Sequence, residues 1–333
     1  MQESKSGPTR TQHVRGGLIV LLVALNLTLV LACLPEAPSQ NTPEPPGPFK
    51  LPTPTPLPPT PTPTPLPAIV PGTVVEDMTR KHEFLIAEEV DGLCGAFLPA
   101  QCRLPAQYSV ETYRIWFRTQ DKDGLLVEIQ ADLRFPKVDE PQAFPIFVYG
   151  AGTTGVASAC APLNEFFAGR DWGEYRTHMM SYTSQGYITI LANWQGYDDR
   201  DLTHPYFVSE LEGRVMLDAA RAVYAFFEEP PSKDILAVPD TPIFLGGYSQ
   251  GGHGALSAAR MAPEYAPELD IKGVIGHATA PDVEGLMFDS PRYAPYIVYA
   301  YRDYYGPDTV DPADIFLPNW LEAFDEDVTS RCI

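Results

Sequence analysis

Apolar stretches of two kinds alternate along the chain from residue 108 onward. Short apolar or alternating runs predict strands, whereas longer runs with apolar positions three or four residues apart predict helices. The expected strands span residues 108–118, 125–135, 143–149, 187–192, 242–247 and 271–276. The expected helices span residues 175–185, 211–227 and 251–260. This alternation predicts an α/β fold, with a mostly parallel sheet and helices on both of its faces.

The pattern changes after Thr279. Aromatic residues recur at helical spacing over residues 293–305 and 320–324, and no further strand pattern follows. We interpret about residues 280–333 as a helical cap, although ordinary amphipathic helices would give the same pattern. The predicted globular domain of residues 72–333 is therefore expected to lack the C-terminal strands of its sheet.

The N-terminal segment has the pattern of a signal peptide. An apolar run of residues 18–32 follows Arg10 and Arg15 and stops at Cys33. This run is shorter than the roughly 20 residues that cross a bilayer, so residues 1–32 are predicted to be removed on export. Cys33 would then carry a diacylglycerol anchor. An uncleaved signal anchor and simple secretion are the alternatives.

A proline-rich segment separates Cys33 from the globular domain. Residues 34–71 contain 16 of the 36 prolines, many of them alternating with threonine. Such a segment lacks the donors and the apolar side chains that packing needs, so residues 33–71 are predicted to be an extended linker. It would hold the domain away from the membrane surface to which Cys33 is attached.

Charge and cysteine content limit the class of protein further. The formal net charge of −20 and the lack of a basic cluster after the signal segment argue against a nucleic-acid partner. No zinc-ligand spacing occurs, and neither a metal nor a cofactor is expected. Four cysteines remain besides Cys33, and an even number in an exported chain suggests two disulfides. Of three possible pairings we favour Cys94 with Cys102 and Cys160 with Cys332.

A motif for covalent chemistry follows the strand at residues 242–247. It reads Gly247-Tyr248-Ser249-Gln250-Gly251, and a helix of small residues comes after it. Gly-x-Ser-x-Gly between a strand and a helix is typical of a nucleophile elbow, because glycines permit the close approach that so sharp a turn needs. Ser249 is the predicted nucleophile, and the N–H of Gln250, unpaired at a helix start, is a predicted oxyanion donor. A Gly-rich turn without a catalytic role is the alternative.

A second Gly-rich loop, Gly150-Ala151-Gly152-Thr153-Thr154-Gly155, directly follows the strand at residues 143–149. In a fold with a nucleophile elbow, this loop supplies the second oxyanion donor. The N–H of Thr153 or of Thr154 is the predicted donor. A phosphate loop is disfavoured because Gly-Lys-Ser/Thr is absent and no lysine lies nearby. A tight loop without a catalytic role is the other alternative.

The chain resembles the secretory lipases, a branch of the α/β-hydrolases. The resemblance is carried by several motifs in order: Tyr149 to Gly155 leading to Cys160-Ala161-Pro162, Asn193-Trp194-Gln195-Gly196-Tyr197 with His204-Pro205-Tyr206, Glu212-Gly213-Arg214, Leu217-Asp218-Ala219-Ala220-Arg221, and the elbow. It implies an α/β-hydrolase fold with a helical cap, a Ser-Asp-His triad, and hydrolysis of acylglycerols or other carboxylic esters. One departure is that Ala151-Gly152 stands where such proteins commonly have His-Gly.

The acid and the base of a triad are not evident in the sequence. In this fold they follow the serine, on loops after late strands. Only His253 and His277 follow Ser249, and neither has that position; His253 is expected to have a packing or capping role. Either the last strands are absent from this sequence, or the chain is a non-catalytic relative. From the elbow, the Gly-rich loop and the resemblance we expect a membrane-tethered serine ester hydrolase acting through an acyl-enzyme, of which this chain, without the Asp and the His, would be an inactive fragment. The alternative is a truncated or catalytically inactive hydrolase-fold lipoprotein with a binding role, and a peptidase or dienelactone-type hydrolase is a lesser one.

Overall fold

The computed structural model describes residues 70–99, 102–165, 174–199 and 201–333. The predicted signal peptide of residues 1–32, the predicted lipidation site Cys33 and nearly all of the predicted linker lie outside the described residues. Within the described part, none of the helices combines the length and the hydropathy that a membrane span requires.

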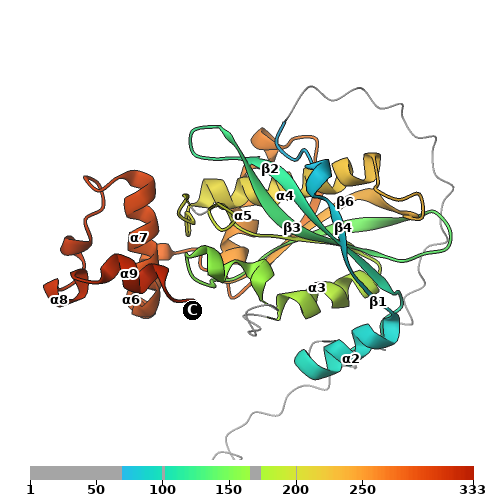
Figure 1. The fold of residues 1–333 in the computed structure, drawn as a ribbon, viewed down its shortest axis with the longest axis horizontal. Helices are drawn as coiled ribbons and strands as arrows, with labels where there is room; N and C mark the ends of the chain where they lie inside the picture. The colour runs from blue at the N-terminus through green and yellow to red at the C-terminus, as the bar shows by residue number, and fades with distance from the viewer. Residues whose placement is uncertain (1–69, 100–101, 166–173, 200) are drawn as a thin grey trace, which may run out of the picture. The chain divides into compact units, whose positions relative to one another are not determined.

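The described strands form a seven-stranded mixed sheet in the order β1-β2-β3-β5-β4-β6-β7 (Figure 1). The strands are β1 (Arg80–Leu85), β2 (Val110–Gln120), β3 (Leu126–Pro136), β4 (Gln142–Gly150), β5 (Ile188–Ala192), β6 (Ala237–Tyr248) and β7 (Ile271–His277). Strands β5, β4, β6 and β7 run parallel, whereas β1, β2 and β3 pair antiparallel and β3 joins β5 antiparallel. All six strands expected from the sequence are present, and the α/β prediction is confirmed.

Helices cover both faces of this sheet (Figure 1). They are α3 (Tyr175–Ser184) on one face and α4 (Ser209–Glu228) and α5 (Gln250–Tyr265) on the other. Successive side chains of a strand point to opposite faces of the sheet, so alternate residues of β4 pack in two separate apolar cores. Ile146 and Val148 are buried with residues of α4 and α5, whereas Phe147 and Tyr149 are buried with residues of α3.

Two elements near the start of the described chain were not expected. Strand β1 is mostly exposed and rich in charge, with the sequence Arg-Lys-His-Glu-Phe-Leu, so it lacks the apolar alternation of a half-buried strand. Helix α2 (Ala87–Phe97) contains two glycines and buries only Val90 and Cys94. Both elements lie at the margin of the domain, where little apolar surface is buried.

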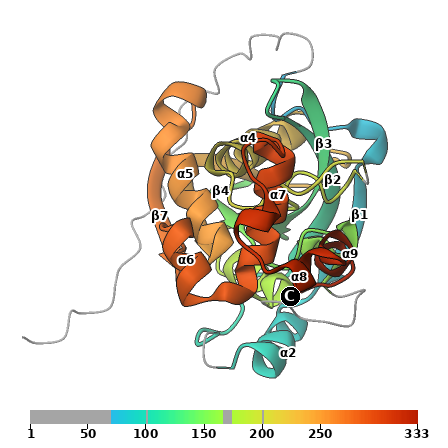
Figure 2. The ribbon, with the colours of Figure 1, turned by 90° about the vertical axis from the view of Figure 1, so that its left-hand side faces the viewer.

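The segment after Thr279 is helical throughout its regular parts. Its elements are α6 (Val283–Asp289), α7 (Ala294–Tyr305), α8 (Pro318–Leu321) and α9 (Phe324–Thr329), with 3₁₀ turns at Pro291–Tyr293 and Pro312–Asp314. Further 3₁₀ turns lie earlier in the chain, at Glu76–Met78, Ser158–Cys160 and Pro162–Asn164. Helices α6 to α9 stand together in front of the sheet in Figure 2. Helices α6, α7 and α9 share an apolar cluster with Tyr206 and Phe207, which precede α4.

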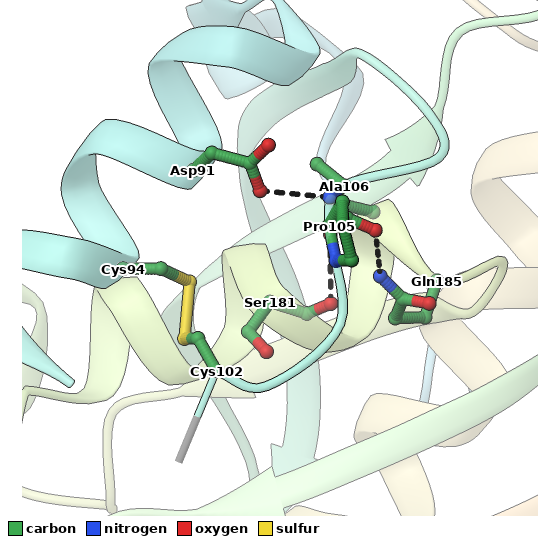
Figure 3. The surroundings of a disulfide bond; sticks show 8 residues. Asp91, Cys94, Cys102, Pro105, Ala106, Ser181 and Gln185 are labelled. Carbon is green, nitrogen blue, oxygen red and sulfur yellow. Dashed lines mark hydrogen bonds between the residues drawn. A yellow bond between two sulfur atoms is a disulfide. The ribbon is translucent and has the colours of Figure 1, made fainter. Parts of the chain in front are cut away.

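Two disulfides are present in this domain, and they are the two pairings that we favoured. Cys94 and Cys102 close a short loop between α2 and the chain that follows it (Figure 3). The same loop is fixed by a hydrogen bond of 2.7 Å from the Ala106 N–H to the Asp91 carboxylate. Cys160 and Cys332 join the loop after β4 to the last residues of the chain, across a sequence separation of 172.

Candidate active site

Ser249 occupies a strained turn between β6 and α5. Its φ of 51° and ψ of −111° place a non-glycine residue in a region that side chains rarely adopt. Such a conformation costs on the order of 1–3 kcal/mol, and strain of this size clusters at functional sites. The Ser249 N–H donates to the carbonyl oxygen of His277 at 2.9 Å, and the Ser249 carbonyl accepts from the His253 N–H at 3.1 Å. The local geometry is therefore the strand-turn-helix arrangement that a nucleophile elbow requires.

Glycines allow the backbone segments around Ser249 to touch. A Cβ atom placed on Gly247 would lie 2.1 Å from the carbonyl carbon and oxygen of Gly251. A Cβ atom on Gly251 would lie 1.8 Å from the carbonyl oxygen of Gly150. Both distances are far below any contact that a real side chain makes, so the first turn of α5 packs directly on the start of the 150–155 loop.

The 150–155 loop is held by the side chains of tyrosines. The Gly152 N–H donates to the Tyr175 hydroxyl at 2.9 Å. The Thr153 hydroxyl pairs with the Tyr206 hydroxyl at 2.6 Å, and the Thr154 hydroxyl with the Tyr197 hydroxyl at 3.2 Å. The hydrogen bonds of the described residues leave the backbone N–H groups of Thr153 and Thr154 unengaged.

Exposure distinguishes the two predicted loop donors. Thr154 is fully buried, whereas Thr153 is only half-buried. The Gln250 N–H, at the first position of α5, is likewise unengaged within the described part of the chain. The structure thus brings the loop with Thr153 and Thr154 against the elbow with Ser249 and Gln250, as the sequence predicted. The tyrosines that fix the loop were missed, because they come from segments distant in the sequence.

A buried hydrogen-bond cluster, which we call the elbow brace, lies behind Ser249. It consists of Gln250, Glu212, His204, His253 and Ser209. The Gln250 side-chain N–H₂ donates to the Glu212 carboxylate and to His204 Nε2, both at 2.8 Å. Glu212 is 2 % exposed and also accepts from the Phe207 N–H at 3.0 Å. The residue that follows the candidate nucleophile is therefore anchored from the inside of the domain.

The proton positions on His204 follow from its two partners. Its Nδ1 lies 3.0 Å from the carbonyl oxygen of Gln195, which can only accept, so Nδ1 carries the proton. Its Nε2 is then free to accept from Gln250. Burial lowers the pKa of His204 to about 3, so the ring is neutral at physiological pH.

A serine, a histidine and a glutamate form a chain within the brace. His253 Nδ1 lies 2.6 Å from the Glu212 carboxylate, and its Nε2 lies 2.9 Å from the Ser209 hydroxyl. With Nδ1–H donating to Glu212, the Ser209 hydroxyl donates to Nε2. This is the hydrogen-bond order of a catalytic triad. Ser209, however, lies in the regular first turn of α4 and lacks the strained backbone of Ser249.

Among the described residues, the histidines form no hydrogen bond with the Ser249 hydroxyl. No hydrogen bond of the described residues involves that hydroxyl, and His253 is committed to the brace. The His277 ring, at the end of β7, lies 6.3 Å from the His178 ring between centroids. Burial, and then the proximity of His277, lower the pKa of His178 to about 4. The described residues also contain no group of three or more side chains suited to hold a metal ion.

Comparison with known proteins gives a consistent family. Residues 175–298 match the family model of the secretory lipases. Lipase A of Moesziomyces aphidis is 26 % identical over 170 residues, which cover 49 % of this chain and 34 % of that protein. The chain thus spans about a third of the length of this curated relative.

Solved structures share the fold at low sequence identity. The rice cell wall degrading esterase LipA from Xanthomonas oryzae has a TM-score of 0.64 and 17 % identity, over 79 % of this chain and 68 % of that one. Candida antarctica lipase A has a TM-score of 0.56 and 19 % identity, over 79 % and 56 %. A putative hydrolase from Legionella pneumophila has a TM-score of 0.59 and 20 % identity, over 76 % and 66 %. These likenesses show an α/β-hydrolase fold, and residues 175–298 are similar to the secretory lipases.

Proposed function

We propose that the chain is a serine carboxylic-ester hydrolase of the lipase or esterase type, with Ser249 as its nucleophile. The observation that carries this proposal is the strained backbone of Ser249 at the β6–α5 turn, beside a loop with unengaged N–H groups. Strain of this kind is retained where a side chain must be presented to a substrate. The names of the relatives, lipase and esterase, support an acylglycerol or another carboxylic ester as substrate.

The reaction would proceed through an acyl-enzyme. The Ser249 oxygen attacks the ester carbonyl carbon, and the hydroxyl proton must pass to a general base, a role that the described hydrogen bonds assign to no histidine. The N–H groups of Gln250 and of Thr153 or Thr154 stabilise the negative oxygen of the tetrahedral intermediate, each contributing on the order of 3 kcal/mol. Thr153 is the better placed of the two threonines, because Thr154 is fully buried. The base returns this proton to the alcohol as it leaves. Water then attacks the carbonyl carbon of the acyl-enzyme, the bond to the Ser249 oxygen breaks, and the acid is released.

The location that we propose is outside the cytoplasm. Both disulfides fit an oxidising compartment. The sequence of residues 1–71 supports export followed by a lipid anchor on Cys33 and a proline-rich linker. Incorporation of an alkyne-tagged fatty acid into the chain, and its loss in Cys33→Ser, would test the anchor.

Hydrolysis of p-nitrophenyl esters by the purified chain tests the proposed function. We expect Ser249→Ala to remove the activity. Ser209→Ala is the informative comparison, because Ser209 is the serine that already contacts a histidine. Activity retained in Ser249→Ala but lost in Ser209→Ala would show that Ser209 is the nucleophile and would contradict the proposal.

A binding role on an inactive hydrolase fold is the second candidate. It is favoured by the lack of any hydrogen bond between a described histidine and the Ser249 hydroxyl. A chain that unfolds cooperatively in urea, yet neither hydrolyses esters nor reacts with an activated phosphonate, would contradict the enzyme proposal and leave the binding role as the candidate to test.

A further inference from the structure

Residues 204–208, directly before α4, contact both the elbow and the 150–155 loop, and we call them the pre-α4 segment. Three of its side chains, those of His204, Tyr206 and Phe207, are at most 2 % exposed. Phe207 also has a φ of 58°, which a bulky side chain rarely adopts. Backbone strain persists where the surroundings fix the residue, and it clusters at functional sites. The contacts of this segment show what it holds in place.

The first contact of the pre-α4 segment fixes the side chain of Gln250. The two hydrogens of the Gln250 amide point to two acceptors, His204 Nε2 and the Glu212 carboxylate, each at 2.8 Å. The reversed amide would place its oxygen against both acceptors, so these partners determine its orientation. Among the described residues, the Gln250 oxygen then has no hydrogen-bond partner although it is buried. The amide is therefore oriented by its two donor contacts alone.

Both acceptors of the Gln250 amide are themselves held in place. The His204 ring stacks on the Tyr197 ring, with centroids 4.5 Å apart. Glu212 accepts from the Phe207 N–H at 3.0 Å, so the strained residue directs its backbone to the carboxylate that binds Gln250. The side chain of residue 250 is thus attached to two fixed points. Its backbone N–H, a proposed oxyanion donor, is restricted accordingly.

The second contact of the pre-α4 segment fixes the loop that carries the other proposed donor. The Tyr206 hydroxyl lies 2.6 Å from the Thr153 hydroxyl. Tyr206 is fully buried whereas Thr153 is half-buried, so the tyrosine is the more constrained partner of this pair. The contact uses the threonine hydroxyl, and the hydrogen bonds of the described residues leave the Thr153 N–H unengaged. One short segment therefore contacts both residues whose N–H groups are the proposed oxyanion donors.

We propose that His204, Tyr206 and Glu212 are positioning residues of the oxyanion hole. They act through Gln250 and Thr153 and contact no reacting atom. Donors stabilise an oxyanion effectively when they are already in place as the charge develops, so fixing their direction supports the chemical step and not the binding of the ester. The inference rests on the proposed function, because it concerns the N–H groups that the proposed mechanism assigns to the oxyanion.

Two conservative variants remove these contacts and keep the backbone donors. Tyr206→Phe removes the hydroxyl that contacts Thr153, and Gln250→Met removes the amide that the elbow brace anchors. Tyr224→Phe is the matched control, because the Tyr224 hydroxyl donates to the backbone carbonyl of Asp240, near the start of β6. Urea unfolding establishes that each variant is folded before its kinetics are compared.

Hydrolysis of a soluble p-nitrophenyl ester distinguishes positioning from a purely structural role. We expect kcat to fall about 10- to 100-fold in Tyr206→Phe and in Gln250→Met, less than the roughly 100- to 1000-fold that loss of an oxyanion donor causes. KM should change by less than about twofold, because the ground state does not use these donors. The Kd of an alkylboronic acid, which forms a tetrahedral adduct on the serine, should rise by the same factor as kcat falls.

The opposite kinetic results are equally clear. An unchanged kcat in either folded variant would overturn the positioning role of the contact that it removes. A rise in KM at unchanged kcat would assign the contact to ester binding and would likewise overturn it. Tyr224→Phe should match the unmodified chain in kcat, KM and boronate Kd.

Crystal structures of the two variants separate this inference from the proposed function. If the unmodified chain neither hydrolyses an ester nor binds a boronate, the proposed function fails, and the positioning role is still decided by geometry. We expect the N–H groups of residues 153 and 250 to diverge in Tyr206→Phe and in Gln250→Met. If both N–H groups keep their wild-type directions, glycine packing alone fixes them and the inference is overturned.

Discussion

At the residue scale, the elbow depends on backbone contacts that only glycine permits. Gly251 lies against Gly150, and Gly247 lies against Gly251, at distances that leave no room for a methyl group. Ser249 itself has a positive φ without being a glycine. Phe207 and Ala278 also have positive φ, but of these three residues Ser249 is the one that carries a nucleophilic side chain.

Substitution of Gly251 tests this packing. Gly251→Ala would place a methyl group 1.8 Å from the Gly150 carbonyl oxygen, so we expect a loss of about 3 kcal/mol in the free energy of unfolding. Gly95→Ala is the matched control, since Gly95 lies in α2 with open space around it and should become slightly more stable, by up to about 1 kcal/mol. Urea unfolding measures both, and equal effects would contradict the account.

The elbow brace predicts a second difference between neighbouring residues. Glu212 is buried and accepts hydrogen bonds from three donors. Glu210, two residues earlier on α4, is exposed and forms an ion pair with Arg214. Glu212→Gln should lower the free energy of unfolding by about 2 kcal/mol, because the amide N–H₂ of the new glutamine would face the buried N–H donors that Glu212 now accepts from. Glu210→Gln should change stability by less than about 0.5 kcal/mol. Similar values for both would show that the brace contributes little.

At the element scale, the loop of residues 150–155 is tied to the end of the described chain. The Thr154 carbonyl oxygen accepts from the Ile333 N–H at 2.9 Å, and the Cys160–Cys332 disulfide lies beside this contact. The helices after Thr279 are thus connected to the loop that holds the proposed oxyanion donors. The cap interpretation of residues 280–333 stays a prediction.

The two disulfides are expected to differ in their effect on stability. In the loop-entropy description, a bridge that closes 172 residues contributes about 5 kcal/mol, and one that closes 8 residues about 2.5 kcal/mol. We therefore expect the double alanine variant of Cys160 and Cys332 to lower Tm roughly twice as much as that of Cys94 and Cys102. Thermal unfolding of both variants measures this, and the reverse order would contradict it.

The sequence predicted the elements that bury apolar surface and missed those that do not. The strands from residue 108 onward were found because their apolar runs are long and are bounded by turn residues. Strand β1 was missed because its edge position leaves charged residues exposed. The elbow and the Gly-rich loop were found because glycine spacing is visible in sequence. The elbow brace was not predicted, because the sequence alone does not distinguish a buried glutamate on α4 from an exposed one.

At the scale of the whole molecule, buried titratable groups determine the response to acid. The folded chain keeps His204 and His178 neutral down to about pH 3 and 4 because burial lowers each pKa. The unfolded chain protonates both below about pH 6.5, so these residues reduce stability as the pH falls. Asp218 acts in the opposite direction. Burial raises its pKa to about 6, so the folded chain binds this proton at a higher pH than the unfolded chain and gains stability as the pH falls.

The balance of these groups gives a net sign. Burial also lowers the pKa of His82 and raises that of Asp198, so three histidines oppose two aspartates and stability should fall on acidification between pH 6.5 and 5. Urea unfolding across this range measures the slope. Stability that stays constant or increases on acidification would show that these histidines are not buried as described.

The central claim, that Ser249 is a presented nucleophile, is tested most directly by covalent labelling. The purified chain is treated with a fluorophosphonate, and the modified residue is located by peptide mass spectrometry. We predict modification at Ser249 that is absent from Ser249→Ala and unchanged in Ser330→Ala, an exposed serine near the chain end. A folded chain that remains unmodified at Ser249, or that is modified at Ser209 instead, would contradict the claim.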